Sequence, residues 1–516
     1  MAKMKNWAAV CLVAGAFLCQ AGDVAAPKKA GVAFRFDDNK PAALWKNLAA
    51  LFDRYDYKLS YAVTSQKLRA NTPEVEALRE ISARGHRVID HVPTHAIYQI
   101  QARNQKEFDE FSKLPFTDHA DPKTKTVFFK CEVDLKHPRT LKFQGEIKNG
   151  ELTGFPADMA KHLGFSRKIY IPATGKMYGI RMQQGKRMIC SFWRENIKVP
   201  DYKGEIVIPT GITIQPSDEL LRFQAQVTRN NFKAFGLPLP KVWAQPGGWE
   251  NYVSLPKIRK IYGKEFGYNS ADSIPGHSKA RDNSFGDPDP EWGRYQMCVD
   301  FTGLDNGQDI RAMKAKIAEA VAKNRVKIFI SHIWIHRVKG GWDAYAKGYE
   351  ELFAWLKKHQ IPVKTQEEWA EVLYSGKSGL AGNIMPSLKT DIDEDGKPDG
   401  YDFKAGLKCD LKTGVVTIPP GKKLHISDLA GLQKGPAEFS LAVKGKKGTE
   451  VVLNFLFIVR KGKNYFEQRK FRLSGDDWEV LRGNVTVKPE AFTLHYGIQA
   501  RGKDSSIEVR DPEFKH

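Results

Sequence analysis

The sequence predicts an α/β protein, because short apolar strands alternate with amphipathic helices along two separate blocks of the chain. The first block covers residues 27–96 and the second covers 214–375. Strands that follow one another through helices form parallel sheets. From residue 403 to the end, short alternating strands are separated by Gly, Lys and Asp, which predicts a C-terminal β-sandwich over 403–516.

The helices and strands of the first block follow from the periodicity of its apolar residues. Thr72 is expected to cap the second helix, and Gly85 to end it. In chain order we expect strand, helix, strand, helix and strand over 31–36, 41–54, 59–63, 72–84 and 86–89.

The second block resumes the same pattern. Thr365 and Glu368 form a capping box that begins its closing helix. We expect helices over 216–235, 310–324, 342–358 and 365–373, with strands at 242–244, 326–330 and 361–363.

Between the two blocks, residues 97–213 contain short alternating stretches punctuated by Gly and Lys. They predict a β-rich insertion, built as a small sandwich, with a role in substrate binding or in packing beside the α/β domain. Residues 376–402 are expected to form a linker. By its topology, the sandwich predicted at 403–516 resembles a carbohydrate-binding module, and a stabilising appendage is the alternative.

Two histidines, His91 and His95, lie four residues apart after a strand, and Pro93 between them disfavours a helix through both. The pair is therefore expected at the carboxyl end of a strand, where α/β folds place their chemistry. Two neutral imidazoles aimed at one point favour a cation with a third, anionic ligand, and Asp37-Asp38 after the first strand offers one. Each half alone could equally be a helix cap or a loop histidine, whereas both together indicate a site.

Phe36-Asp37-Asp38 followed by Gly-His-x-x-x-x-His-x-x-x-His resembles the first two motifs of the polysaccharide deacetylases, the NodB-homology fold of carbohydrate esterase family 4. The resemblance implies a distorted (β/α) barrel over 27–96 and 214–375, and hydrolysis of acetyl groups from a glycan. It also implies that Asp38, His91 and His95 hold Zn²⁺ or another divalent transition metal, and that Asp37 is the catalytic base.

The strand at 326–330 ends in Ser331-His332. This is similar to the last motif of the family, in which an apolar strand precedes a histidine that acts as general acid. The resemblance therefore implies that His332 is the acid, and His336 is a second candidate.

The family places Arg-x-Pro-x-Gly after the strand at 242–244, and its arginine holds the catalytic aspartate. This chain has Ala244 in the arginine's place. Gln245 can hydrogen-bond but supplies no charge. The missing arginine therefore weakens the expectation of strong catalysis, whereas the expectation of a metal site is unchanged. Gln245, Trp249 and Trp292 are candidate substrate contacts. For Trp292, a place in the core is an equal alternative.

An acidic loop lies within 376–402. Its acidic residues match positions 1, 3, 5, 9 and 12 of a calcium-binding loop, and Gly396 matches position 6. The sequence therefore predicts a Ca²⁺ site, with a solvated acidic turn as the alternative. The expected ligands are Asp391, Asp393, Asp395, Asp399 and Asp402.

The formal net charge is +21 over 516 residues. Lys and Arg are spread along the chain without an arginine-rich arm or a recognisable nucleic-acid fold, so we expect no nucleic-acid partner. The charge is consistent with an acidic polysaccharide partner or with a soluble, lysine-rich surface.

Residues 1–26 have the basic start, short apolar run and small-residue end of a signal peptide, which predicts a secreted or periplasmic protein. Phe17-Leu18 before Cys19 is a poor lipobox and argues against a lipid anchor. No stretch is long enough to predict a transmembrane segment.

The implied mechanism is metal-assisted hydrolysis, in which Asp37 takes a proton from water and His332 protonates the leaving group. The site chemistry suits Zn²⁺ and also Fe, Co or Ni. One rival is a degenerate deacetylase fold that binds glycan without turnover. Another is a glycoside hydrolase, which needs two carboxylates facing the sugar, and no such pair can be placed in the sequence.

Overall fold

The computed structural model describes residues 30–95, 99–102, 116–118, 127–129, 132–134, 141–154, 168–183, 187–191, 199–208, 210–246, 255–273, 296–298, 300, 303–307, 309–374, 380, 382–404, 406–459, 462–502 and 504–516. The predicted signal peptide, Trp249 and Trp292 lie outside these residues. Of the helices in the described part, none is long and apolar enough to cross a membrane.

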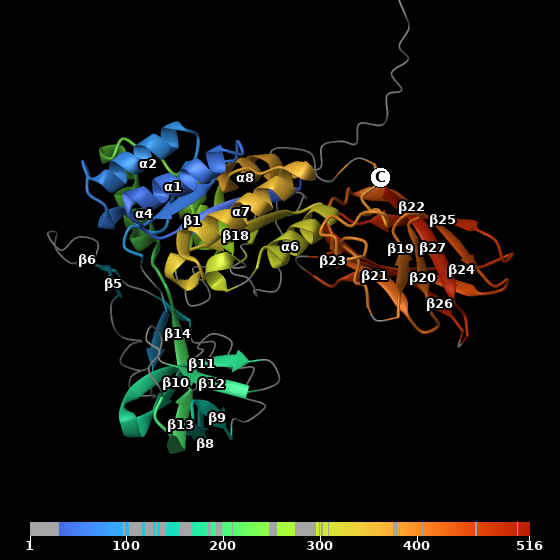
Figure 1. Cartoon of the computed structure of the whole chain (residues 1–516), viewed down its shortest axis with the longest axis horizontal. Helices are drawn as coiled ribbons and strands as arrows, with labels where there is room; N and C mark the ends of the chain where they lie inside the picture. Colours follow the sequence, from blue (N-terminus) through green and yellow to red (C-terminus); the bar gives the residue numbers. More distant parts are fainter. Residues whose placement is uncertain are drawn as a thin grey trace, which may run out of the picture.

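A parallel seven-stranded sheet organises the α/β domain (Figure 1). Its order is β17-β16-β15-β3-β2-β1-β18, so strands that are consecutive within this sheet lie side by side, and the last one returns to the first. The strands are β1 Gly31–Asp37, β2 Ser60–Val63, β3 Arg87–Asp90, β15 Val242–Trp243, β16 Ser270–Ser273, β17 Gln296–Cys298 and β18 Val326–Ser331.

The sheet is curled. Asp300, just beyond β17 at one end of the strand order, forms a parallel bridge with Phe329 of β18 at the other end. The Asp300 amide donates to the Ile328 carbonyl at 2.7 Å, and the Ile330 amide donates to the Asp300 carbonyl at 2.8 Å. The predicted α/β class is therefore confirmed, with its two sheet edges brought together.

Helices cover the outside of this sheet (Figure 1). The six helices expected from the sequence are confirmed to within two residues at each end. Thr72 accepts a hydrogen bond from Val75 as predicted, and Thr365 and Glu368 form their capping box. These helices are α1 Ala42–Asp53, α2 Pro73–Ala83, α4 Asp218–Ala234, α6 Ile310–Ala322, α7 Gly341–Lys358 and α8 Gln366–Tyr374.

Shorter helical segments occur between the strands. They are η1 Ser65–Lys67, α5 Leu255–Ile258, the π-helix η5 Arg259–Glu265, and the 3₁₀ turns η7 Leu304–Asn306 and η8 Ile335–Arg337.

Strand β1 is buried on both faces, and its residues alternate between two environments. Phe34 and Phe36 pack outward among aromatic rings of α1 and α7. Two of these rings, Phe52 of α1 and Phe353 of α7, contact each other with their centroids 4.6 Å apart. The alternate positions hold Arg35 and Asp37, so both project to the other face of the sheet. A charged pair is thereby built into the interior of the domain.

The insertion differs from the small sandwich predicted from sequence. Six of its strands form a closed antiparallel barrel, in the order β10-β11-β12-β9-β8-β13. That prediction was wrong because alternation of apolar residues is the same in a sandwich and in a barrel. The barrel strands are β8 Leu141–Lys148, β9 Glu151–Thr153, β10 Lys168–Ile171, β11 Lys176–Gln183, β12 Arg187–Ser191 and β13 Tyr202–Ile208.

A small three-stranded sheet, ordered β4-β14-β7, lies between the barrel and the α/β domain (Figure 1). Its strands are β4 Gln99–Ala102, β7 Glu132–Asp134 and β14 Thr210–Gln215. A separate pair, β5 Phe116–Asp118 and β6 Val127–Phe129, is also described, and the turn η3 Pro172–Thr174 belongs to the barrel region.

The C-terminal residues form a β-sandwich, as predicted. One sheet has the order β19-β20-β27-β22-β25 and the other β21-β26-β23-β24. The strands are β19 Lys408–Asp410, β20 Val415–Ile418, β21 Lys423–Leu429, β22 Gly435–Gly445, β23 Glu450–Val459, β24 Tyr465–Arg472, β25 Glu479–Val487, β26 Ala491–Arg501 and β27 Ile507–Lys515.

Part of the stretch expected to be a linker packs into this sandwich. Ile384, Met385, Leu388 and Tyr401 are buried in its core. The sandwich is also hydrogen-bonded to the α/β domain, because the Asn324 side chain donates to the carbonyls of both Ile384 and Ala430 at 3.1 Å. The two domains are therefore joined by ordered contacts.

Candidate functional site

The candidate residues meet at the carboxyl ends of three parallel strands. Phe36 pairs with Ser331, so Asp37 and His332 follow at the same level on neighbouring strands. Val63 pairs with Asp90, which places His91 at that same edge two strands away from β1. Residues far apart in sequence are thus brought to one end of the sheet, as the parallel topology requires.

Asp38, His91 and His95 form a group whose ligand atoms all lie within 4.8 Å of one another. His95 Nε2 is 3.3 Å from Asp38 Oδ1, and His91 Nε2 is 3.7 Å from the same oxygen. The His91 side chain is 2 % exposed, whereas those of His95 and Asp38 are 27 % and 34 % exposed. The group is therefore anchored on one side and open to solvent on the other.

The orientation of His91 is fixed from β15. Its Nδ1 lies 3.1 Å from the carbonyl oxygen of Ala244, and a carbonyl can only accept a hydrogen bond. Nδ1 therefore carries the proton, which leaves the lone pair of Nε2 facing Asp38 and His95. Fixing a histidine tautomer through its second nitrogen is the usual way in which proteins prepare an imidazole for a metal.

Four non-glycine residues around this edge adopt left-handed backbone conformations. Their φ angles are 72° at Asp38, 57° at Val92, 58° at His95 and 53° at Ile333. Such conformations are disfavoured for residues with a Cβ and concentrate at functional sites, where the surrounding structure holds them. Two of the four belong to the metal-ligand group itself.

Asp37 is held by an arginine from its own strand. Arg35 Nε donates to Asp37 Oδ1 at 2.7 Å, and a second guanidinium nitrogen donates to Oδ2 at 2.8 Å. Both residues are buried, with Arg35 1 % exposed and Asp37 3 % exposed. Burial raises the pKa of Asp37, but Arg35, His91 and His332 outweigh it and hold that pKa below its ordinary value.

His332 follows β18, and its backbone is tied to Asp305. Asp305 Oδ2 accepts hydrogen bonds from the His332 amide and from the Ser331 hydroxyl, each at 2.9 Å. The imidazole stacks on Trp334 at 4.3 Å between centroids and 7° between planes, and the Arg337 guanidinium lies 3.7 Å from the Trp334 ring. This loop therefore presents His332 in a defined orientation, while His336 is exposed.

Burial has the largest effect on the pKa of both His91 and His332. It lowers the pKa of His91 to about 4, and it lowers the pKa of His332 despite the opposing charges of Asp37 and Asp38. Burial also acts to raise the pKa of Asp38, but the hydrogen bond with His95 and the charges of His91 and His332 lower it overall. At neutral pH His91 is therefore a neutral imidazole beside the ionised carboxylate of Asp38, which is the protonation state that a transition metal requires of such donors.

Gln245, a predicted substrate contact, directly follows Ala244 and is only 7 % exposed. Trp249 and Trp292, the other two candidates, lie outside the described residues. Sequence reasoning missed Arg35, Asp305 and Trp334. A signal existed for Arg35 alone, because an arginine in the apolar run Gly31–Phe36 must be paired if it is buried.

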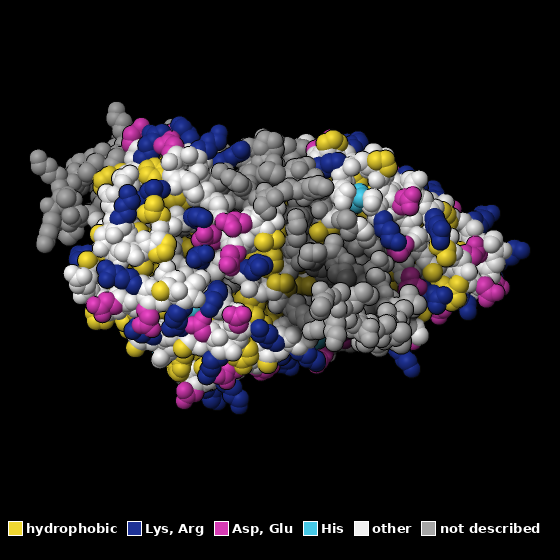
Figure 2. All heavy atoms as spheres, turned by 90° about the horizontal axis from the view of Figure 1, so that it is seen from above, with side chains coloured by type: hydrophobic (Ala, Val, Ile, Leu, Met, Phe, Trp, Pro, Cys, Tyr) yellow, Lys and Arg dark blue, Asp and Glu magenta, His cyan; other side chains and the backbone are white. Residues whose placement is uncertain are grey.

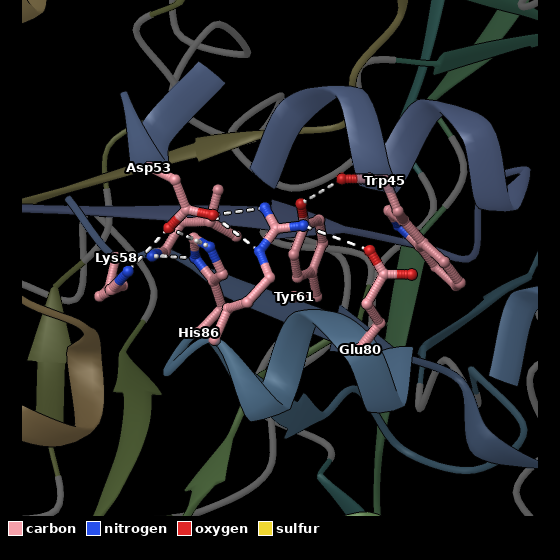
Figure 3. Close-up of polar contacts among 8 residues, drawn as sticks. Trp45, Asp53, Lys58, Tyr61, Glu80 and His86 are labelled. Carbon is pink, nitrogen blue, oxygen red and sulfur yellow. Dashed lines mark hydrogen bonds and ion pairs between the residues drawn. The ribbon is translucent and has the colours of Figure 1, made fainter. Parts of the chain in front are cut away.

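His86, the first histidine of the motif, lies at the opposite end of β3. Its Nδ1 accepts a hydrogen bond from the Leu59 amide at 3.2 Å, and its Nε2 lies 3.2 Å from Asp53 Oδ1. Figure 3 shows this cluster, in which Asp53 also contacts Lys58. The cluster links α1 to the amino ends of β2 and β3, which is a structural role.

The acidic loop brings three of its five candidate ligands together. Ligand atoms of Asp391, Asp393 and Asp395 lie within 4.8 Å of one another. Asp391 accepts hydrogen bonds from the amides of Asp395 and Gly396, at 3.0 and 2.9 Å. This folds the loop around its first carboxylate.

The other two candidates have partners of their own. Asp399 accepts from the Ile392 amide at 2.8 Å, and burial followed by the neighbouring acidic charges raises its pKa to about 7. Asp402 pairs with His425 of β21 at 2.7 Å. The structure therefore places Asp402 with the sandwich, because a strand rather than a helix follows the loop.

No family model matches the chain, and no curated protein matches it. Solved structures similar to parts of it include carbohydrate-binding modules. The CBM22-1 xylan-binding domain from Paenibacillus barcinonensis Xyn10C matches at 13 % identity and a TM-score of 0.21, over 27 % of this chain and 96 % of that domain.

A Clostridium thermocellum xylanase fragment, CBM22-1-GH10 with xylohexaose, matches at 11 % identity and a TM-score of 0.21, over 27 % of this chain and 28 % of that one. A CBM4 structure matches at 13 % identity and a TM-score of 0.16, over 20 % of this chain and 70 % of that one. At these scores the similarity assigns no ligand to this chain.

Proposed function

We propose that this protein is a metal-dependent carbohydrate deacetylase that hydrolyses N- or O-acetyl groups from a glycan. The curled sheet is, in this proposal, the distorted barrel of the polysaccharide deacetylases. The observation that carries the proposal is the convergence of Asp38, His91 and His95 beside Asp37 and His332, at the edge where parallel α/β folds place catalysis.

The ligand group fits a divalent transition metal. Two imidazoles and one carboxylate supply three donors, His91 presents a fixed tautomer, and the exposed side of the group leaves room for further ligands. Zn²⁺ or a similar ion bound there would polarise the acetyl carbonyl and lower the pKa of an attacking water.

Two residues of the chain then carry out one proton transfer each. Asp37 takes the proton of the attacking water, since its carboxylate is ionised and lies at the same edge. His332, in the protonated form that the charges of Asp37 and Asp38 favour, gives a proton to the departing amine or alcohol, and its stack on Trp334 keeps the ring at one angle. The two groups reach the reaction from neighbouring strands.

The substrate class follows from charge only in part. The net charge of +21 favours an anionic glycan. Figure 2 shows one face of the molecule, on which Lys and Arg are spread among acidic side chains instead of forming a single patch. From the predicted signal peptide we infer that the reaction takes place outside the cytoplasm, on an exported or environmental polysaccharide.

The acidic loop is proposed to bind Ca²⁺. Asp393, Asp395 and Asp399 line a cavity of about 300 Å³ beside α6. Burial and the neighbouring acidic charges of Asp395 and Asp391 raise the pKa of Asp393, so a cation among these carboxylates would relieve their repulsion.

The enzyme proposal is tested by acetate release from a panel of acetylated neutral and anionic glycans. Asp37→Asn and His332→Ala should each lower turnover by about a hundredfold or more, the range expected of general acid–base groups. His336→Ala, at the exposed second candidate for the acid, should retain activity, and a loss there in place of His332→Ala would move the acid role to His336. A wild-type protein that binds glycan but releases acetate from none would establish the binding-protein alternative.

A further inference from the structure

The family pattern places an arginine at position 244, and this chain has alanine there. Ala244 is fully buried beside Ala62, Ile89 and Val242, so the site of the missing side chain is filled by the core. The Ala244 carbonyl instead orients His91. A guanidinium must therefore reach Asp37 from elsewhere if that carboxylate is to be held.

We propose that Arg35 is the positioning residue for Asp37, and that its two-point hydrogen bond decides which of the adjacent aspartates is the base and which the metal ligand. The proposal rests on the proposed function for the role of Asp37. Arg35 lies two residues before Asp37 on β1, so both side chains project from the same face of the strand.

Both oxygens of Asp37 are engaged by Arg35, at 2.7 and 2.8 Å. A carboxylate held in this forked geometry cannot turn away to become a metal ligand without breaking two charge-assisted hydrogen bonds. Asp38 has no such restraint from Arg35 and turns through its left-handed backbone toward His91 and His95. The arginine thus separates the roles of two neighbouring, chemically identical side chains.

The burial of the pair makes the arrangement specific to arginine. A lysine at position 35 would supply charge but only a point contact, so it cannot hold both oxygens in one plane. An apolar residue would leave a buried carboxylate without a counter-charge beside the metal-ligand group. Asp37 would then be free to rotate toward the metal.

The first test is a double-mutant cycle on acetate release by the metal-loaded protein. Arg35→Met should lower kcat by about a hundredfold, the scale of losing the base, with KM changed less than about threefold. In the Asp37→Asn background, Arg35→Met should produce no further loss, because it acts through Asp37. The kcat of Arg35→Lys should lie between those of the wild type and of Arg35→Met. An equal loss in both backgrounds, or an Arg35→Met variant with wild-type kcat, would overturn the assignment.

The second test does not depend on activity. The Co²⁺-substituted protein is compared by visible absorption as wild type, Arg35→Met, Arg35→Lys and Arg35→Met/Asp37→Asn. Release of Asp37 toward the metal should change the spectrum of Arg35→Met, and Asp37→Asn should restore it. Identical spectra in wild type and in both Arg35 variants would refute the proposal. If the wild type releases no acetate, the proposed function fails, and these spectra alone decide the role of Arg35.

Discussion

At the scale of single residues, the site is defined by which polar atoms have a fixed partner. The Ala244 carbonyl fixes His91, Arg35 fixes Asp37, and Asp305 fixes the backbone of His332. Each partner comes from a different part of the chain, so one substitution should disturb one functional group without dismantling the others.

The proposed ligand role of His91 leads to a direct test. His91→Ala removes one of the three proposed donors. Because two protein ligands bind a metal ion much more weakly than three, the metal content should fall from about one equivalent per protein to well below one. Metal analysis after dialysis measures this. His336→Ala, at an exposed histidine, should keep the wild-type content. Equal content in wild type and His91→Ala would remove His91 from the ligand set.

His86 predicts a specific dependence of stability on pH. Burial lowers its pKa from 6.5 to about 4, so the folded protein keeps it neutral while the unfolded chain takes up a proton below about pH 6.5. Stability from this group is present above that pH and is lost as the pH falls toward 4. His86→Gln should therefore flatten the fall in melting temperature between pH 6.5 and 4.

The measurement uses metal-free protein, so that pH-dependent release of a metal does not contribute. His336→Gln provides the comparison, because its side chain is exposed. Parallel melting curves of wild type and His86→Gln across this pH range would show that His86 is not responsible for acid sensitivity.

At the scale of elements, helices could be predicted from sequence, whereas strands β16 and β17 and the closed sheets could not; the strand expected at 361–363 is only an isolated bridge from Val363 to Val32. Apolar periodicity, Thr72 and the Thr365–Glu368 pair locate helices because capping is a local interaction. The closure of the insertion into a barrel depends on which strands pair across long separations, such as Tyr170 with Val207, and single-strand patterns do not specify that.

The same distinction applies to the site. The meeting of Asp37-Asp38 with His91 and His95 could be predicted because these residues follow strands of a parallel sheet, which brings them to one edge, whereas the choice of Asp38 as the ligand came from the family resemblance. Asp305 could not, since it lies in a short 3₁₀ turn and reaches His332 only through the tertiary fold. Asp402 was expected in the calcium loop by spacing, but its partner His425 lies on a strand of the sandwich.

The acidic loop provides an element-scale prediction. Ca²⁺ should raise the melting temperature of the protein, because an ion that binds only the folded loop stabilises it by mass action. Asp391→Asn should abolish the shift, since Asp391 belongs to the carboxylate group and organises the loop. Asp410→Asn, in the exposed start of the sandwich, is the control. If neither calcium nor a chelator moves the wild-type curve, the loop is an acidic turn.

At the scale of the whole molecule, the sandwich contacts the α/β domain through hydrogen bonds beside α6 and α7. Asn324 donates to two carbonyls of the C-terminal part, the Ala430 amide donates to the Lys323 carbonyl, and Trp355 Nε1 donates to the Ile392 carbonyl. The acidic loop lies in this joint, and Glu394 pairs with Lys358 of α7. Calcium binding and domain docking should therefore be coupled.

Asn324→Gly tests the joint while accommodating the left-handed backbone, since φ is 58° at this position. The variant leaves two buried carbonyls without their side-chain donor, at a cost of about 1–3 kcal/mol for an unsatisfied buried group. Calorimetry should then show the sandwich and the α/β domain melting further apart than in wild type. Coincident transitions in both proteins would mean that other contacts hold the joint.

The pairing of β1 with β18 has a consequence for how the protein is made. Gly31 is the partner of Val326, so one edge of β1 has no neighbour until nearly three hundred further residues have been synthesised, whereas its other edge pairs with the nearby β2. Until then β1 exposes an apolar edge, and loop closure on this scale slows folding. We therefore expect the central sheet to be completed only after β18 has been synthesised, so that the α/β domain stays partly folded for much of its synthesis.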